Sequence, residues 1–226
     1  MRYECVKLGR FQSRPNRFIA HVLVDGEMAV CHVKNTGRCR ELFVPDAKVV
    51  LAPGMNPARK TLYDVIAVYK GDRLINIDSQ APNRVFREWA LSGGFLPDAQ
   101  TIRPEYVFGQ SRLDFFVETK EKRCLVEVKG VTLEEDGFVR FPDAPTQRGV
   151  KHLTELSAAV KKGYECYAVF VIQMHGVLSF SPNTATDPAF AEALKTAMDA
   201  GVHVLAYDCL TTEDSLAMGE PVSVFV

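Results

Sequence analysis

The stretch Cys124-Leu-Val-Glu-Val-Lys-Gly130 places two charged residues inside an apolar run that is typical of a buried β-strand. Side chains alternate between the two faces of a strand, so Glu127 and Lys129 emerge on the same face. A charge in such a strand costs several kcal/mol to desolvate unless it is paired or bound to a metal ion. The stretch therefore predicts either a salt bridge on an exposed edge strand or a site with a chemical function.

A second run, Ser111-Arg-Leu-Asp-Phe-Phe-Val117, carries Asp114 among apolar residues and precedes the first by a short hairpin through residues 120–123. That hairpin can bring Asp114 beside Glu127. Two carboxylates with an open face suit Mg²⁺ or Mn²⁺, and a nearby lysine can orient a water or stabilise charge that develops on phosphorus. We therefore predict that Asp114, Glu127 and Lys129 form a centre for phosphodiester hydrolysis, with the metal ion bound by the two carboxylates.

The apolar periodicity around these runs predicts an α/β domain with a mixed sheet over residues 81–226. Helical spacing follows Pro82-Asn83 and stops at Gly93-Gly94, and a second helix is expected over residues 146–162. Asp187-Pro188 begins a third helix, which ends at Gly201. We expect strands over residues 106–109, 113–118, 124–131, 166–173 and 202–207.

Residues 1–80 have the pattern of a small antiparallel barrel. Two-residue turn signals at Asp25-Gly26 and Gly71-Asp72 separate short alternating runs. Five short strands without a convincing long helix favour an OB-like barrel, joined to the second domain by a linker near residues 79–83. The predicted strands of this α+β arrangement span residues 17–24, 27–33, 48–52, 61–69 and 73–77.

The composition is that of a globular protein with one large or two small domains, since 47% of its 226 residues are hydrophobic. Six scattered cysteines predict buried thiols, and the lack of a long apolar segment or signal peptide predicts a cytoplasmic protein. Residues 1–80 carry 13 Lys and Arg against 8 Asp and Glu, whereas the remainder carries 14 against 20. A basic half that meets polyanions explains this division, and two ordinary solvated surfaces explain it equally well.

Cations in the basic half lie next to aromatic and small polar residues, as on the nucleic-acid surfaces of OB-folds. There, Lys and Arg bind phosphates while aromatic rings stack on bases. The alternatives are that Phe11 and Phe18 fill the barrel, and that the Asn35–Gly37 turn binds a small anion through backbone amides. The predicted DNA-binding residues of this half are Arg10, Arg14, Arg17, Phe18, Lys34, Asn35, Arg38, Arg59 and Lys60.

The predicted order of helix, three strands, helix and strand resembles the core of the PD-(D/E)XK nuclease superfamily. Asp114 falls in the second strand, and Glu127 and Lys129 fall in the third, as that motif requires. The resemblance implies that these residues are catalytic. It also makes Glu88, in the first helix, a candidate third metal ligand, although a solvent-facing Glu88 fits the sequence at least as well.

The predicted helix after the motif carries Gln147 and Lys151 four residues apart, hence on one face. In the nuclease fold that helix borders the active centre, so both side chains could contact a phosphate or the attacking water. Arg148, His152 and Glu155 form a neighbouring stripe. A solvated helix face explains the same residues, and no histidine is assigned to catalysis because none shows metal-ligand spacing.

Seven segments spread over nearly the whole chain carry a closer resemblance, at residues 11–18, 35–38, 59–61, 111–114, 126–129, 141–144 and 147–152. They are similar to the sugar fermentation stimulation protein (SfsA) family. The resemblance implies an amino-terminal OB-like domain, a carboxy-terminal nuclease-like domain and DNA binding linked to sugar-utilisation genes. It leaves enzymatic activity open.

The leading hypothesis is thus a DNA-binding protein with a divalent-metal phosphodiesterase centre. The alternative is a non-catalytic regulator that keeps the nuclease fold only to hold DNA. A sugar or nucleotide enzyme has less support, because the sequence has no glycine-rich phosphate loop of the Walker or Rossmann type. DNA is the predicted partner, a homodimer is compatible with the sequence, and no membrane partner is expected.

Overall fold

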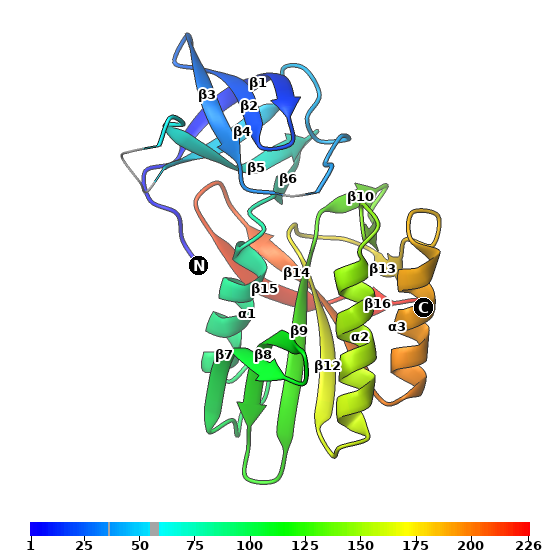
Figure 1. Ribbon diagram of the computed structural model, residues 1–226. Coiled ribbons are helices and arrows are strands. Elements are labelled where there is room, and N and C mark those ends of the chain that lie inside the picture. The colour runs from blue at the N-terminus through cyan, green and yellow to red at the C-terminus, as the bar shows by residue number, and fades with distance from the viewer. Residues whose placement is uncertain (36, 55–58) are drawn as a thin grey trace.

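The computed structural model describes residues 1–35, 37–54 and 59–226, which form a β-barrel followed by an α/β domain (Figure 1). The barrel is one sheet in the order β3-β2-β1-β4-β5-β6, and parallel pairing of β3 with β5 closes it. This is the predicted OB-like architecture. Its strands are β1 (Lys7–Asn16), β2 (Ile19–Val24), β3 (Glu27–Val33), β4 (Lys48–Pro53), β5 (Tyr63–Lys70) and β6 (Arg73–Asn76).

The first strand of the barrel was not expected, and the prediction of a strand over residues 17–24 was wrong at its start. Arg17 and Phe18 form the turn between β1 and β2. Within β1 only Gly9 and Phe11 are buried, so its sequence lacks the apolar alternation that predicts a strand. The other four strands lie within two residues of their predicted bounds.

The second domain is built on a six-stranded mixed sheet in the order β15-β14-β12-β9-β8-β7. Strands β9, β12 and β14 are parallel, whereas β7, β8 and β15 are antiparallel to their neighbours. No named strand from the described part of residues 1–80 joins this sheet, as the predicted division requires. The strands are β7 (Thr101–Phe108), β8 (Ser111–Glu118), β9 (Arg123–Val131), β12 (Glu165–Ile172), β14 (His203–Thr211) and β15 (Leu216–Pro221).

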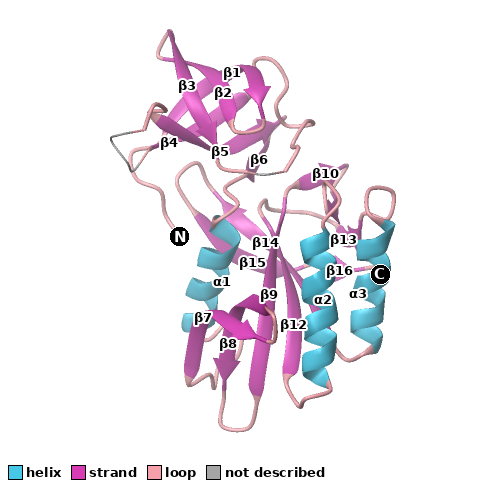
Figure 2. Cartoon of the chain, viewed as in Figure 1, coloured by secondary structure: helices cyan, strands magenta, loops and turns pink. Residues whose placement is uncertain are grey.

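Three helices cover the sheet, and all three were predicted. α1 (Ala81–Leu91) lies on one face, and α2 (Gln147–Val160) and α3 (Pro188–Asp199) lie on the other (Figure 2). Side chains at the start of α2 and α3 cap the helices, since Thr146 accepts a hydrogen bond from the Gly149 amide and Asp187 accepts one from the Phe190 amide. No helix in the described residues is long and apolar enough to cross a membrane.

A small four-stranded sheet and the edge strand β15 were absent from the sequence prediction. The small sheet has the order β10-β11-β13-β16, and its strands are two to four residues long. Such short runs carry no recognisable period. Distant segments fix the pairing of β11 with β13 and of β13 with β16, whereas β10 and β11 form a local hairpin across Asp136-Gly137. The strands are β10 (Leu133–Glu135), β11 (Phe138–Phe141), β13 (Ser179–Pro182) and β16 (Ser223–Val224).

Hydrogen bonds join the barrel to Gln173, the residue that follows β12. The Asn76 amide donates to the Gln173 carbonyl oxygen at 2.8 Å, and Gln173 Nε2 donates to Asn76 Oδ1 at 2.9 Å and to the Asp78 carbonyl oxygen at 3.0 Å. Lys34 Nζ lies 2.9 Å from the buried carboxylate of Asp78. These contacts, together called the seam below, place the barrel above the end of the sheet that carries Glu127 and Lys129.

Candidate active site

Strand β9 carries Glu127 and Lys129 on the face that α2 covers. Leu125 packs in the core beneath α2 and α3, whereas Val126 and Val128 pack beneath α1. The alternation of the strand therefore turns both charged side chains toward α2, as the period of two predicts. Lys129 Nζ donates a hydrogen bond to Glu127 Oε1.

Asp114 lies where the pairing of β8 with β9 stops. The last register pair joins Phe115 to Val126, and one step further the side chain of Asp114 replaces the ladder. Its Oδ2 accepts a hydrogen bond from the Val128 amide at 2.8 Å, and its Oδ1 accepts one from Asn83 Nδ2 at 2.8 Å. Asn83 belongs to the first turn of α1, so a helix and the neighbouring strand β9 together fix this carboxylate.

Glu127 is only 2% exposed and makes its polar contacts through one oxygen. Oε1 accepts hydrogen bonds from Lys129 and from His152 Nδ1, while Oε2 is buried without a partner in the described residues. Burial favours the neutral acid, but the hydrogen bond from His152 and the charge of Lys129 outweigh it and lower the pKa of Glu127. The carboxylate is therefore ionised at neutral pH, with one oxygen left free.

The pKa of Asp114 moves in the opposite direction. Burial raises it, and the negative charge of Glu127 adds to the effect, against hydrogen bonds from the Val128 amide and Asn83. Repulsion from the Glu127 carboxylate contributes to this rise, and a metal ion shared by the two carboxylates stays a prediction. A divalent cation would relieve this repulsion and hold both groups ionised.

The donor set fits a hard divalent ion that keeps several of its waters. Glu127 Oε2 is an orphaned buried acceptor, and a carboxylate oxygen is the ligand type that Mg²⁺ and Mn²⁺ prefer. The described residues contain no group of three or more His, Cys, Asp or Glu side chains arranged to hold an ion. Asp114 and Glu127 would therefore supply the protein's carboxylates, with water completing the shell.

Glu88, the candidate third ligand, does not join this cluster. Its carboxylate lies 2.6 Å from the amino group of Met1, which donates to the Leu216 carbonyl oxygen on β15. Strand β15 is at the edge of the sheet, three places from β9, so this contact places the Glu88 carboxylate away from Glu127. The structure thus gives this residue a contact with the amino terminus instead of the metal role that the resemblance implied.

The two predicted residues of α2 lie at the same border of the site but contact different groups. Gln147 is the exposed first residue of the helix, and its side chain makes no hydrogen bond within the described residues. Lys151 Nζ donates to the Gln110 carbonyl oxygen at 3.2 Å, in the turn between β7 and β8. Neither side chain touches Asp114, Glu127 or Lys129, so a contact with substrate stays a prediction for both.

His152 is the functional residue that the sequence analysis missed. It is buried, its Nδ1 donates to Glu127, and its Nε2 accepts from Arg148 Nε at 3.4 Å. Glu155, one turn further, has a buried oxygen without a partner in the described residues. The signal was present as the stripe of Arg148, His152 and Glu155, but only the rotation of α2 reveals that this stripe faces Glu127.

The barrel contributes a cationic pocket of about 380 Å³, which we call the arginine pocket. The Arg14 guanidinium lies 4.6 Å from the centre of the Phe43 ring and donates to the carbonyl oxygens of Arg38 and Arg17 at 2.5 and 2.7 Å. No acidic residue lines the pocket, so it suits a phosphate. Its lining residues are Arg14, Asn16, Arg17, Arg38, Arg40 and Phe43.

Aromatic residues of the barrel divide between core and surface. Phe11 is 3% exposed and fills the barrel, whereas Phe18 is 40% exposed and has the Arg17 guanidinium 4.8 Å from its ring centre. The barrel-filling alternative therefore holds for Phe11 only. Phe18 has the exposure that stacking on a base requires.

Several other cations of the predicted DNA surface have structural partners. Lys34 pairs with Asp78, and Arg59 Nη2 contacts Asp64 at 2.6 Å. Arg10 donates to the Asp46 carbonyl oxygen at 3.1 Å, whereas Lys60 is exposed. Lys34 and Arg59 thus stabilise the barrel, which leaves the arginine pocket as the strongest cationic feature of this domain in the described residues.

The backbone amides that directly follow the Asn35–Gly37 turn bind a carboxylate of the second domain, and binding of a small anion by the turn itself stays a prediction. The Arg38 and Cys39 amides donate to Asp143 Oδ2 at 2.7 and 3.5 Å, and Asn35 donates to the Ile77 carbonyl oxygen at 2.9 Å. Thr36 in this turn lies outside the described residues. The contact with Asp143 adds another bond between barrel and second domain.

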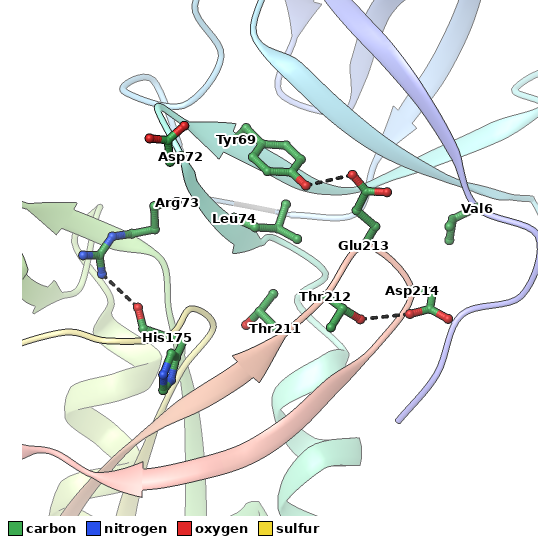
Figure 3. A pocket seen from close by; sticks show the side chains of 10 residues that line it. All are labelled: Val6, Tyr69, Asp72, Arg73, Leu74, His175, Thr211, Thr212, Glu213 and Asp214. Carbon is green, nitrogen blue, oxygen red and sulfur yellow. Dashed lines mark hydrogen bonds between the residues drawn. The ribbon is translucent and has the colours of Figure 1, made fainter.

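A separate cavity of about 730 Å³ lies between the barrel and β14–β15 (Figure 3). Polar side chains of its lining bond one another: Tyr69 donates to Glu213 at 2.8 Å, and Thr212 donates to Asp214 at 2.9 Å. Lys48, outside the lining, also donates to Glu213 at 3.0 Å. Three acidic residues, Asp72 included, line the cavity against one arginine. This arrangement does not suit a phosphate.

Comparison with known proteins gives one consistent result for the whole chain. Residues 13–77 match a family model described as the SfsA N-terminal OB domain, and residues 80–215 match the sugar fermentation stimulation protein RE domain. A sugar fermentation stimulation protein homolog from Clostridium beijerinckii is 52% identical over 100% of both chains, and one from Desulfitobacterium hafniense DCB-2 is 54% identical over 99% of this chain and 98% of its own. The structure of Pyrococcus furiosus SfsA in complex with Ca²⁺ has a TM-score of 0.90 and 26% identity, covering 100% of this chain and 98% of the other.

Proposed function

The chain belongs to the sugar fermentation stimulation protein family, and we propose that it binds DNA and hydrolyses phosphodiester bonds at a divalent-metal centre formed by Asp114 and Glu127. The observation that carries this proposal is Glu127 itself: it is ionised and buried, and it has one oxygen without a partner in the described residues. A buried charge with an unused acceptor is costly in a residue that only stabilises a fold. The Ca²⁺ complex of the Pyrococcus relative supports a hard-cation site in this fold.

The side chains around Glu127 have distinct tasks in this proposal. A bound Mg²⁺ or Mn²⁺ would polarise the phosphate and lower the pKa of its water. Lys129 lies on the same face and would hold the charge that develops on phosphorus. His152 fixes the orientation of Glu127, and Asn83 does the same for Asp114.

DNA binding is assigned to the barrel and to the edge of the second domain beneath it. The arginine pocket would hold phosphates, and the exposed ring of Phe18 would stack on a base. Lys151 at the start of α2 would meet the strand on the other side of the site. The name of the family connects its members with sugar fermentation, so binding near sugar-utilisation genes forms part of the proposal.

The decisive experiment is incubation of the purified protein with single-stranded, duplex and branched DNA in the presence of Mg²⁺ or Mn²⁺. We expect cleavage of at least one form by the native protein and none by Glu127→Gln. Cleavage that persists in Glu127→Gln would contradict the proposed centre.

The alternative function is a DNA-binding regulator without catalysis, and one observation favours it. Glu127 already has two cationic or hydrogen-bonding partners without a metal ion, and the described residues offer no third acidic ligand. Tight binding of DNA without any cleavage in Mg²⁺ or Mn²⁺ would support this alternative.

The arginine pocket gives a prediction that is independent of cleavage. Replacing both Arg14 and Arg17 with Ala should weaken binding of all DNA sequences alike and reduce the salt slope of binding by about one for each lost phosphate contact. Arg123→Ala, at the opposite end of β9, is the matched control. Fluorescence anisotropy titrations at several salt concentrations measure both effects, and an unchanged salt slope in the double variant would exclude the pocket as a phosphate site.

A further inference from the structure

Between the arginine pocket and the carboxylate cluster lies a second pocket of about 390 Å³, here called the seam pocket. Arg17 lines both the arginine pocket and the seam pocket. On its other side the seam pocket is lined by Gly130, the residue that follows Lys129 in β9. A strand that runs from the arginines to the cluster therefore passes this pocket immediately before it reaches the proposed site of cleavage.

Gly130 has no side chain, so Gln173 and Pro82 pack directly against β9 at this edge of the pocket. A Cβ atom at this position would lie 2.5 Å from Gln173 Oε1 and 2.6 Å from Pro82 Cγ, which is closer than real contacts allow. The pocket volume falls within the range of about 300–1,000 Å³ that is typical of small-ligand sites. The space is thus large enough for one nucleotide and too small for a duplex.

Gln173 presents a fixed acceptor to this space. The residue is 1% exposed, and both hydrogens of its Nε2 are used in the seam, by Asn76 and by Asp78. Its Oε1 receives no hydrogen bond within the described residues, although Gln173 lines the pocket. A buried acceptor that is held in place and left open is suited to an amino or imino group of a ligand.

The remaining walls suit a nucleobase attached to a phosphate. Phe141 and Pro142 give an apolar surface, and the Phe141 ring is held by edge contact with Phe190 at 5.1 Å. Arg17 and Arg140 carry positive charge, and Arg140 also pairs with Glu135. Thr132 lines the pocket too, as does Asp143, whose carboxylate accepts hydrogen bonds from the Arg38 and Cys39 amides. Apolar contact for a ring, hydrogen-bonding groups for its edge and cations for its phosphate are the parts from which pockets for an unstacked base are built.

We propose that the seam pocket receives the base of one unpaired nucleotide next to the phosphate bound at Asp114 and Glu127, so that the substrate is DNA with an unpaired or extruded nucleotide. This inference rests on the proposed DNA-binding function and specifies its substrate. The base leaves the stack and enters the pocket, while Arg17 holds the neighbouring phosphate. Fully paired DNA lacks the group that the pocket binds.

The test compares three duplexes of one sequence: fully paired, with a one-nucleotide bulge, and with an abasic nucleotide at the bulge. Binding is measured by fluorescence anisotropy with EDTA present, so that no cleavage interferes. The native protein should bind the base-bearing bulge about tenfold more tightly than the abasic bulge. Equal affinity of the native protein for these two duplexes would overturn the inference.

Ala144→Trp fills the pocket from its partly exposed loop without touching the carboxylate cluster. It should remove the preference for the base while leaving affinity for the abasic bulge unchanged. Ala158→Trp, at an exposed position on α2 about 17 Å from the first residue of that helix, should keep the preference. Circular dichroism confirms that both variants fold, and a preference that survives in Ala144→Trp would also overturn the inference.

The outcomes separate this inference from the function on which it rests. Binding of the duplexes without discrimination between base and abasic site refutes the pocket and leaves DNA binding intact. Failure to bind any of the three duplexes refutes both.

Discussion

Glu127 and Glu134 are buried glutamates seven residues apart in sequence, and the protein uses them differently. Glu134 is 5% exposed, and both of its oxygens have partners: Oε2 accepts from Lys70 Nζ at 2.8 Å and Oε1 accepts from the Gly137 amide at 2.7 Å. Glu127 is buried to a similar degree but leaves Oε2 without a partner in the described residues. The difference between the two glutamates therefore lies in the carboxylate oxygen of Glu127 that no group in the described residues binds.

The two glutamates also differ in what they connect. Lys70 belongs to the barrel, so Glu134 joins the two domains. Glu127 has two partners, Lys129 and His152, and both belong to the second domain. Loss of Glu134 should therefore lower the stability of the protein, whereas loss of Glu127 should lower its proposed activity.

The largest expected effect distinguishes the two residues by activity. Glu127→Gln should reduce DNA cleavage by at least about 10²-fold, because it removes a charged ligand of the proposed metal centre. Glu134→Gln should cleave at nearly the native rate. The cleavage rates of both variants are measured on the DNA that the native protein cleaves best. Equal losses of rate would contradict the different roles proposed for Glu127 and Glu134.

The next effect concerns the free energy of unfolding. Glu134→Ala should lower it by about 2–3 kcal/mol, because Lys70 and the Gly137 amide lose their acceptor in a buried place. Glu135→Ala is the matched control, since Glu135 is exposed and pairs only with Arg140 on the surface. Urea unfolding of both variants gives the comparison. A loss below that of Glu135→Ala would show that the bond from Glu134 to the barrel contributes nothing.

Metal binding sharpens the comparison at a smaller scale. At a concentration ten times its Kd, Mg²⁺ or Mn²⁺ should stabilise the native protein by about 1.4 kcal/mol. The gain should vanish in Asp114→Asn and Glu127→Gln and persist in Glu134→Ala. Thermal melts with and without the ion measure it, and a gain that survives in Glu127→Gln would place the ion elsewhere.

The smallest effect is a pH dependence carried by Glu134. Burial alone would raise the pKa of this carboxyl, but the hydrogen bonds from Lys70 and the Gly137 amide outweigh burial and lower it. A lowered folded-state pKa gives stability that is complete above the ordinary value of 4.5 and is lost as pH falls through the folded value. The free energy of unfolding should therefore fall more steeply between pH 7 and pH 3 for the native protein than for Glu134→Gln. Parallel curves would contradict this assignment.

The placement of Glu127 and Lys129 on one face of β9 could be predicted because it depends on local geometry alone. A period of two places Glu127 and Lys129 on one face, and a hairpin brings Asp114 to them. Glu88 and His152 could not be assigned in this way, since the role of each depends on how its helix is rotated against the sheet. The spacing of apolar residues shows which side of a helix is buried, but it does not fix the rotation of the helix closely enough to distinguish a residue that faces the site from its neighbour on the surface.

The unpredicted parts of the fold share a different cause. The pairings of β11 with β13 and of β13 with β16 join residues 41 and 44 positions apart, as in Phe138 with Ser179 and Ser179 with Ser223, and no local signal predicts them. The β10–β11 hairpin does have a local signal, the Asp136-Gly137 turn, which the sequence analysis did not use. The seam pocket depends on the same long-range contacts, because Gly130, Gln173 and Arg17 come from distant parts of the chain. The barrel and the sheet were predictable separately, and the space between them was not.

The hydrogen bonds of the seam fix the distance between the barrel and the proposed site of cleavage. Gln173 is bonded to Asn76 and Asp78, and Asp78 is bonded in turn to Lys34 of the barrel, so the arginine pocket is held at a set separation from Glu127. A strand anchored by its phosphates on one domain would present the same internucleotide bond to the other in every encounter. The number of nucleotides between the phosphates bound in the arginine pocket and the bond that is cut would then be set by the protein and not by the sequence of the DNA.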